Sequence, residues 1–474
     1  MSHNSFINLA GKPLTLTGLN SSQTLFALVQ DLPWSIWLDS ANSKHVDSRY
    51  DIIVWQPKAT LTTYGNDTDI HWLKNDKKIT SQRDPLQLVK EIQADIFANI
   101  SITGVPYQAI KKNAEMLPFM GGSLGYFSYD LGRRFEVLPE YAEQDISQPE
   151  MAVGIYTQAI IFDNNSEQYY LVCPDNERSG IENWLVEQFQ NTQKLQHFQL
   201  TSAWHSNISE QDYRKKFQQV QDYLLSGDCY QINLAQRFSA HYQGEEFLAY
   251  LSLREENKAP FSAFMRFEKG CVLSISPERF LQLKNGSVQS KPIKGTRPRS
   301  KDPTIDKANA KVLKHAPKDN AENLMIVDLL RNDISKVCQP GSVIVPKLFE
   351  IESFPAVHHL VSTVEGKLDP KFDGTDLLRG AFPGGSITGA PKIRAMEIIE
   401  ELEPHRRSVY CGSIGYISAC GNMDTSITIR TLVCEKNTIY CWAGGGLVAD
   451  SNVDSEYQET FDKVHHILPV LSKL

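Results

Sequence analysis

One lysine in this chain stands where it could act as a nucleophile. Lys294 lies between an apolar residue and a glycine in the stretch Pro292-Ile-Lys294-Gly-Thr296. Partial burial in a cleft lowers the pKa of a lysine and frees its amine to attack carbon. A solvated loop lysine beside other basic residues is the alternative use of the same stretch.

Two carboxylate pairs could bind a divalent cation. Asp319 with Glu322, and Glu456 with Glu459, are each spaced one helical turn apart. If the two helix faces met, four carboxylates would need protons or a cation to neutralise them. Ligation by oxygen alone favours Mg²⁺, which keeps some of its waters and leaves room for an anionic substrate. Two ordinary solvated helix faces would show the same spacing.

Several further residues could hold an anion. Gly444, Gly445 and Gly446 offer backbone N–H groups with no Cβ in the way, and so does the Gly384-Gly385-Ser386 turn, which we expect at a helix N-terminus. Arg430 lies in a strand-like run and needs a carboxylate partner if it points inward. His359 is either a structural histidine or a catalytic one.

Composition restricts the class of protein. The chain has 474 residues, 41% hydrophobic and 22% charged, with a formal net charge of −8. This charge argues against nucleic acid held by bulk electrostatics, and no apolar stretch is long enough to span a membrane. Met1 to Ser5 lack the features of a secretory leader, so we expect a cytoplasmic protein. The eight cysteines include no C-x-x-C pair, which predicts buried reduced thiols.

The elements that must position these residues read as mixed α+β. Residues 1–200 alternate strand-like runs with turns, as at 51–55 and 159–162, and a polar span from Glu187 to His205 is the candidate linker. From 201 to 474, a helix over 209–227 precedes several strands, including a hairpin turning at Asn285-Gly286 whose second strand ends at Lys294. We expect Asp319 to cap the next helix. We further expect one strand over 425–434, another ended by the triple glycine, and a closing helix over 454–474.

Taken together, these segments resemble the chorismate-utilising enzymes, which include anthranilate, aminodeoxychorismate, isochorismate and salicylate synthases. The resemblance is detailed from Ser209 onward and looser before it. The motifs that carry it are Tyr230-Gln231-Ile-Asn-Leu, Ser276-Pro-Glu278, Pro292-Ile-Lys294-Gly-Thr296, Ala321-Glu322-Asn-Leu-Met-Ile-Val-Asp-Leu-Leu-Arg-Asn-Asp, Phe382-Pro-Gly-Gly-Ser386-Ile-Thr388-Gly-Ala-Pro-Lys392, Tyr410-Cys-Gly-Ser-Ile-Gly-Tyr, Ala443-Gly-Gly-Gly446 and Ser455-Glu456-Tyr-Gln-Glu459.

The resemblance implies a large α/β sandwich of two packed sheets, formed by residues 1–200 and 201–474 together, and a Mg²⁺ cofactor. It implies that Glu322 and Glu459 bind the metal directly, that Asp319 and Glu456 act through water, and that Glu278 protonates the leaving C4 hydroxyl. The remaining positions match substrate contacts: Gln231, Tyr410, Arg430, Gly444, Gly445, Gly446 and Lys463, with Ser386 and His359 beside the ring. Ser386 replaces a threonine common in the family and keeps the hydroxyl.

Two positions divide the family. Members that add water at C2 carry a lysine base where this chain has Gln231, which argues against isochorismate or salicylate synthesis. Anthranilate synthases resemble Pro-Ile-Ala-Gly-Thr, whereas this chain has Lys294 in place of the alanine, as aminodeoxychorismate synthases do. The resemblance then implies that Lys294 attacks C2 and that ammonia enters C4, giving 4-amino-4-deoxychorismate on the way to 4-aminobenzoate and folate. Anthranilate synthesis, or a non-catalytic homologue that binds chorismate or an amino acid, are the alternatives.

Partners follow from what the chain lacks and from one further likeness. No glutamine-hydrolysing segment is visible, so we expect a separate glutamine amidotransferase subunit to supply ammonia in a heterodimer. Leu38-Asp39-Ser40-Ala41 and Pro260-Phe261-Ser262 resemble the tryptophan-binding elements of anthranilate synthase. A tryptophan pocket formed by Ser40, Pro260, Phe261 and Ser262 is therefore a further expectation.

Overall fold

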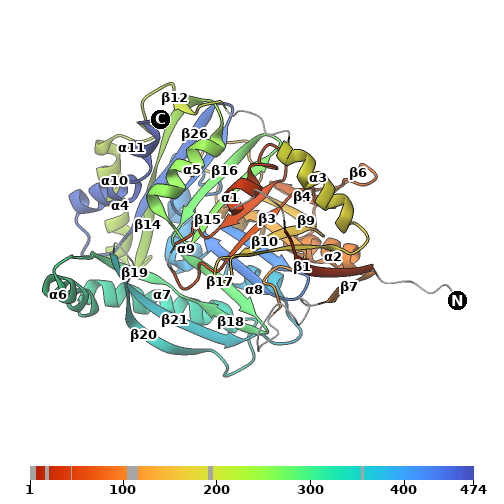
Figure 1. Cartoon of the computed structure of the whole chain (residues 1–474). Helices are drawn as coiled ribbons and strands as arrows, with labels where there is room; N and C mark the ends of the chain where they lie inside the picture. Colours follow the sequence, from red (N-terminus) through yellow and green to blue (C-terminus); the bar gives the residue numbers. More distant parts are fainter. Residues whose placement is uncertain (1–6, 16–20, 44, 104–115, 191–195, 354–356) are drawn as a thin grey trace.

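A computed structural model describes residues 7–15, 21–43, 45–103, 116–190, 196–353 and 357–474. Two large β-sheets dominate it, and helices lie around them (Figure 1). The expected α+β sandwich of two sheets is confirmed. Met1 to Ser5 and part of the expected linker lie outside the described residues.

The first sheet has 14 strands, drawn from both sides of residue 200. In sheet order they are β12 (Gln199–Leu200), β14 (Gln231–Gln243), β26 (Thr438–Leu447), β25 (Thr431–Glu435), β16 (Gly270–Ser276), β15 (Phe261–Phe267), β2 (Ile36–Asp39), β3 (Tyr50–Val54), β10 (Ala159–Asp163), β11 (Gln168–Pro174), β1 (Ile7–Pro13) and β7 (Ile100–Thr103), with β13 (His205–Ser206) and β22 (Gly389–Ala390) paired to β14.

The second sheet has 12 strands and is mixed in the same way. In order they are β19 (Ile293–Pro298), β21 (Val357–Lys367), β18 (Ser287–Ser290), β17 (Arg279–Lys284), β24 (Met423–Ile427), β23 (Ser413–Ser418), β8 (Gly122–Phe127), β9 (Met151–Tyr156), β4 (Ala59–Tyr64), β5 (Asp67–Trp72) and β6 (Lys77–Ser81), with β20 (Ile344–Ser353) paired to β21.

The helices vary in length and include two short 3₁₀ turns. They are α1 (Ser22–Phe26), α2 (Pro85–Phe97), η1 (Tyr129–Arg134), α3 (Arg178–Gln190), α4 (Glu210–Ser226), α5 (Glu246–Asn257), α6 (Pro303–Lys314), α7 (Pro317–Ser335), α8 (Gly374–Ala381), η2 (Gly385–Ile387), α9 (Lys392–Leu402), α10 (Val453–Val464) and α11 (Leu468–Leu471). As predicted, Ser209 caps α4 and Gly227 ends it in a left-handed conformation.

The strand alternation of the sequence divides the apolar side chains between two cores. In β3, Ile52 and Val54 join a core that also contains Leu61 and Leu124 of the second sheet, so this core lies between the sheets. The intervening Ile53 faces a second core under α1, α5 and α11, on the outer face of the first sheet. Successive strand residues point to opposite faces, which explains this division.

Five expected boundaries are wrong. Residues 187–190 belong to α3, and residues 199–200 and 205–206 pair with β14, so the polar span is not simply a linker. The 425–434 run is two strands, β24 and β25, in different sheets. The triple glycine lies inside β26 because it pairs with β14. The last helix breaks into α10 and α11, and α9 begins only at Lys392, with Pro391 at its N-cap.

All eight cysteines are free thiols, as predicted. Seven of them are buried and Cys420 is partly exposed. Across the described ranges, no helix is both long and apolar enough to cross a membrane.

Candidate active site

A cleft of about 630 Å³ brings most of the predicted residues together. Those that line it are Glu278, Lys294, Asp319, Glu322, His359, Ser386, Tyr410, Arg430, Gly444, Gly446, Glu456, Glu459 and Lys463. They come from both sheets, from the loop at 382–391, and from α7 and α10. The segments are far apart in sequence, so only the fold could place them around one cavity.

Two chain crossings between the sheets form one corner of this cleft. The chain passes from β16 to β17 through Pro277-Glu278, and from β24 to β25 through Thr428–Arg430. Two backbone hydrogen bonds join the crossings, from Ile275 to the Arg430 carbonyl at 3.0 Å and from Ile427 to the Glu278 carbonyl at 3.1 Å. Glu278 and Arg430 are therefore fixed close to each other where the sheets meet.

The sequence suggested that Arg430 lies in a strand, but it lies in the crossing between β24 and β25. Its φ of 51° lies in the left-handed region, which is uncommon for a residue with a side chain. Burial lowers the pKa of its guanidinium, and the nearby Glu278 opposes that shift. Arginine stays protonated over the whole physiological range, so the site holds a fixed positive charge suited to a carboxylate.

Lys294 lies in β19, beside an irregularity in its pairing with β21 between Lys294 and Thr296. We expected Lys294 at the end of the hairpin over 279–290. It lies beyond that hairpin, because the chain leaves β18 and begins a new strand at Ile293. Its ammonium nitrogen donates to the carbonyl oxygen of Ser386 at 3.2 Å. Burial lowers the pKa of Lys294, although Glu322 and Glu278 oppose the shift. Desolvation thus favours the neutral amine, the nucleophilic form.

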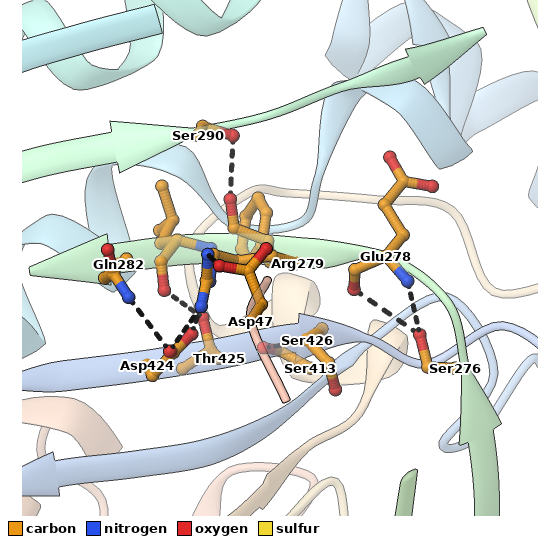
Figure 2. Close-up of polar contacts among 12 residues, drawn as sticks. Asp47, Ser276, Glu278, Arg279, Gln282, Ser290, Ser413, Asp424, Thr425 and Ser426 are labelled. Atoms are coloured by element: carbon orange, nitrogen blue, oxygen red, sulfur yellow. Dashed lines mark hydrogen bonds and ion pairs between the residues drawn. The ribbon is translucent and has the colours of Figure 1, made fainter. Parts of the chain in front are cut away.

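Burial shifts the pKa of Glu278 upward, in the direction opposite to that of Lys294. The side chain is 7% exposed, and burial raises its pKa to about 7, with Lys294 and the Ile293 backbone opposing the rise. Figure 2 shows its carboxyl projecting away from the cluster of Arg279, Asp47 and Asp424, while the Glu278 backbone contacts the Ser276 hydroxyl. A protonated carboxyl at neutral pH is suited to general-acid catalysis.

The two carboxylate pairs face the cleft from α7 and α10. An ideal Cβ on Gly445 would lie 3.1 Å from Oε2 of Glu456 and 3.4 Å from Oε1 of Glu459, so the glycine leaves room for two carboxylates to approach the strand. Asp319 does not cap α7, because Ala316 occupies that position; it lies in the first turn and pairs with Arg297 at 3.1 Å.

Lysines neutralise these carboxylates. The Lys318 ammonium is 3.4 Å from Glu456 and 4.0 Å from Glu322, and that of Lys463 is 2.7 Å from Glu459. Within the described ranges, no three His, Cys, Asp or Glu side chains are already drawn together around a common point for a metal ion. The carboxylate oxygens are nevertheless suitable ligands for a hard divalent cation, and the ammonium groups among them show that this position attracts positive charge.

The walls beside these groups are aromatic and polar. Tyr410 stacks on Trp442 with ring centroids 6.1 Å apart. Nδ1 of His359 is 2.8 Å from the Thr296 hydroxyl, and burial lowers the pKa of His359 to about 4, which favours neutral imidazole at neutral pH. The Lys463 ammonium also donates to the Gly444 carbonyl at 2.6 Å.

Two predicted residues lie just behind the cleft wall. Gln231 is 1% exposed and packs so closely on Gly446 that a Cβ there would be 2.0 Å from its Nε2. Gly445 faces the carboxylates of α10 rather than the cavity. The Gly384-Gly385-Ser386 turn forms η2 and does not open α9, so it is not the expected helix N-terminus.

The expected tryptophan pocket corresponds only in part to a second cavity, of about 330 Å³, between the sheets. Pro260, Phe261 and Ser262 line it, with the Arg279 ion pairs to Asp47 and Asp424 at 2.8 and 2.9 Å. Ser40 is not among the lining residues; its hydroxyl donates to Asp51 at 2.6 Å.

Asn233, Arg297, Lys318 and Trp442 are among the cleft residues that sequence reasoning missed. Asn233 is two residues after Gln231 in the same strand, and Lys318 is four residues before Glu322 in the same helix, so strand and helix periodicity could have found both. Trp442 lies two residues before the glycine run, and Arg297 shares β19 with Lys294.

Fold and cleft together place an amine, an acid and the positive charge of Arg430 around a cavity suited to a small anionic substrate. The sequence model of the chorismate binding enzymes matches residues 35–469. Aminodeoxychorismate synthase component 1 of Escherichia coli K12 is 53% identical over 456 residues, covering 96% of this chain and 97% of that protein. Anthranilate synthase component 1 of Aquifex aeolicus is 33% identical, covering 92% and 89%.

A solved structure agrees with this relationship. Anthranilate synthase component I from Streptococcus pneumoniae TIGR4 superposes with a TM-score of 0.77 at 31% identity, covering 90% of this chain and 93% of that one. The chain belongs to the chorismate binding enzyme family.

Proposed function

We propose that this protein is an enzyme that converts chorismate and ammonia to 4-amino-4-deoxychorismate. The observation that carries the proposal is that Lys294, half-buried and with a lowered pKa, lines one cleft with the buried acid Glu278. The relatives at 53% identity and nearly full coverage bear the name aminodeoxychorismate synthase component 1, which supports this product over others of the family.

The roles of the side chains follow from their protonation states. The neutral amine of Lys294 forms a bond to C2 of chorismate as both ring double bonds shift and the C4 hydroxyl leaves. Glu278 gives its proton to that hydroxyl, which departs as water, and the resulting carboxylate takes the proton that the attacking amine loses. Ammonia then bonds to C4, both double bonds shift back, and the C2–N bond breaks; the proton that ammonia loses passes to the lysine nitrogen, which restores Lys294. Two easier displacements thus replace one difficult displacement.

The other residues bind and orient the substrate. Arg430 and Lys463 supply positive charge for its carboxylates, and His359 and Ser386 lie beside the position of the ring. Glu322 and Glu459 would hold Mg²⁺ directly, with Asp319 and Glu456 through water. When bound, Mg²⁺ neutralises substrate carboxylate charge and fixes its position.

The test is incubation with chorismate, ammonium and Mg²⁺, with and without a lyase that releases 4-aminobenzoate. We expect 4-aminobenzoate only with the lyase, and none from Lys294→Ala. Mass spectrometry should find the adduct on the peptide that contains Lys294. Direct formation of fluorescent anthranilate would support anthranilate synthesis instead, and chorismate binding without turnover, even with the partner present, would support a non-catalytic homologue.

Two further proposals concern partners. We infer that a separate glutamine amidotransferase subunit supplies the ammonia in the cytoplasm; the relatives' designation as component 1 supports a multi-component enzyme. Glutamine-dependent activity that appears only when such a subunit is added would test this. We also infer that the 330 Å³ cavity takes tryptophan, because it combines Phe261 and Pro260 with charged groups. Calorimetry without tryptophan binding, and no tryptophan released on denaturation, would reject the second proposal.

A further inference from the structure

A lysine that sequence reasoning missed stands between the two acidic helices. Lys318 is the second residue of α7, and its ammonium nitrogen lies 3.4 Å from Oε1 of Glu456 on α10. The same nitrogen is 4.0 Å from Oε1 of Glu322, one turn further along α7. One positive charge therefore bridges the carboxylates of both helices.

The carboxylates on either side are much less exposed than the lysine. The side chain of Glu456 is 4% exposed and that of Glu322 16%, whereas that of Lys318 is 52% exposed. Uncompensated carboxylates at such burial would be costly, so a cation near them stabilises the fold. The exposed stem of Lys318 nevertheless lets its ammonium swing into solvent without opening the core.

The ammonium and a divalent cation cannot share this position. Mg²⁺ approaches carboxylate oxygens to about 2.1 Å, and a second cation held by the same oxygens would be strongly repelled. Lys463 differs, because its ammonium also donates to the Gly444 carbonyl and is held there independently of Glu459. Lys318 is the cation that can leave.

We propose that Lys318 is a tethered counter-ion that occupies the metal position in the metal-free protein and is displaced when a divalent cation binds. This inference rests on one part of the proposed function, namely that the cleft binds Mg²⁺. It assigns Lys318 a positioning role toward the metal ligands.

Two consequences are measurable without substrate. Replacing Lys318 by methionine removes the competing charge, so Mn²⁺, used as a paramagnetic stand-in for Mg²⁺, should bind about threefold to tenfold more tightly. The metal-free variant should also melt at a lower temperature than the unchanged protein, and added Mg²⁺ should raise its melting temperature by more. Lys318→Arg retains the charge and should behave like the unchanged protein.

The matched control is Lys314→Met, which removes one positive charge from the exposed end of α6, four residues earlier. Electron paramagnetic resonance titrations of the four proteins, with melting curves in chelator and in Mg²⁺, give the comparison. Equal or weaker Mn²⁺ binding by Lys318→Met, or the same gain in Lys314→Met, would overturn the inference. Neither outcome would contradict the proposed conversion of chorismate. Absence of Mn²⁺ binding in all four proteins would overturn both the inference and the metal role in the proposed function.

Discussion

Replacing Glu278 by glutamine should abolish turnover and, at the same time, stabilise the folded protein above neutral pH. Burial raises the pKa of Glu278 from 4.5 to about 7, so the folded protein binds this proton more tightly than the unfolded chain does. The contribution of the protonated Glu278 carboxyl to the free energy of unfolding is fully present below about pH 4.5 and declines as pH rises toward 7. Above pH 7 the charged carboxylate carries its full burial cost. Glutamine keeps the shape and never ionises.

The size of the effect follows from the shift. A pKa difference of about 2.5 corresponds to about 3 kcal/mol, since one pKa unit is about 1.4 kcal/mol. Because the unfolded chain is already partly ionised at pH 5, the gain of Glu278→Gln over the unchanged protein should grow by about 2–3 kcal/mol between pH 5 and pH 8. Only this difference between the two pH values is diagnostic, because lost contacts of the substituted side chain contribute at both.

The assay is urea unfolding at pH 5, 6, 7 and 8, followed by the fluorescence of the chain's seven tryptophans. Glu268→Gln, at an exposed position between β15 and β16, is the matched control and should show no such growth. The kcat/KM of the unchanged enzyme should also fall about tenfold per pH unit above about pH 7. A stability gain that stays the same at pH 5 and pH 8 would refute the argument that Glu278 is desolvated.

Other expectations concern neighbouring groups. Lys294→Met should remove product and adduct yet raise the melting temperature at pH 7, because the folded protein binds the lysine proton less tightly than the unfolded chain and loses stability as pH falls. Gly445→Ala should weaken Mn²⁺ binding at least tenfold in the same titration, since its Cβ would meet both carboxylates of α10. Arg430→Lys should raise KM for chorismate about tenfold with a smaller change in kcat, measured by steady-state kinetics.

The sequence predicted the features that local periodicity determines. Ser209 and Gly227 mark the ends of α4, and alternation in β3 separates the two cores. The one-turn spacing within the carboxylate pairs correctly predicted that Glu322 and its partner Asp319 lie on one helix, and Glu459 and its partner Glu456 on another. Such signals need only a few adjacent residues, so a sequence contains them directly.

What the sequence could not show depends on pairing over long distances. The run 425–434 has the composition of one strand, but its two halves pair with different partners, β17 and β16, in different sheets. The break falls at Arg430, a residue type that gives no turn signal. The triple glycine looks like a strand end, yet β14 pairs along its whole length, and close packing of Gln231 and the carboxylates of α10 requires the missing side chains.

Burial at the corner between the sheets gives the cleft both of its reactive groups. Desolvation by burial lowers the pKa of Lys294 in β19 and raises that of Glu278 in the crossing at 277–278. Outside the fold, both groups would be charged at neutral pH, the amine protonated and the acid ionised. Desolvation moves each toward its neutral form, which is the form in which the amine can attack and the acid can donate. The reactive state thus depends on the packing of the two sheets as much as on the identity of the two residues.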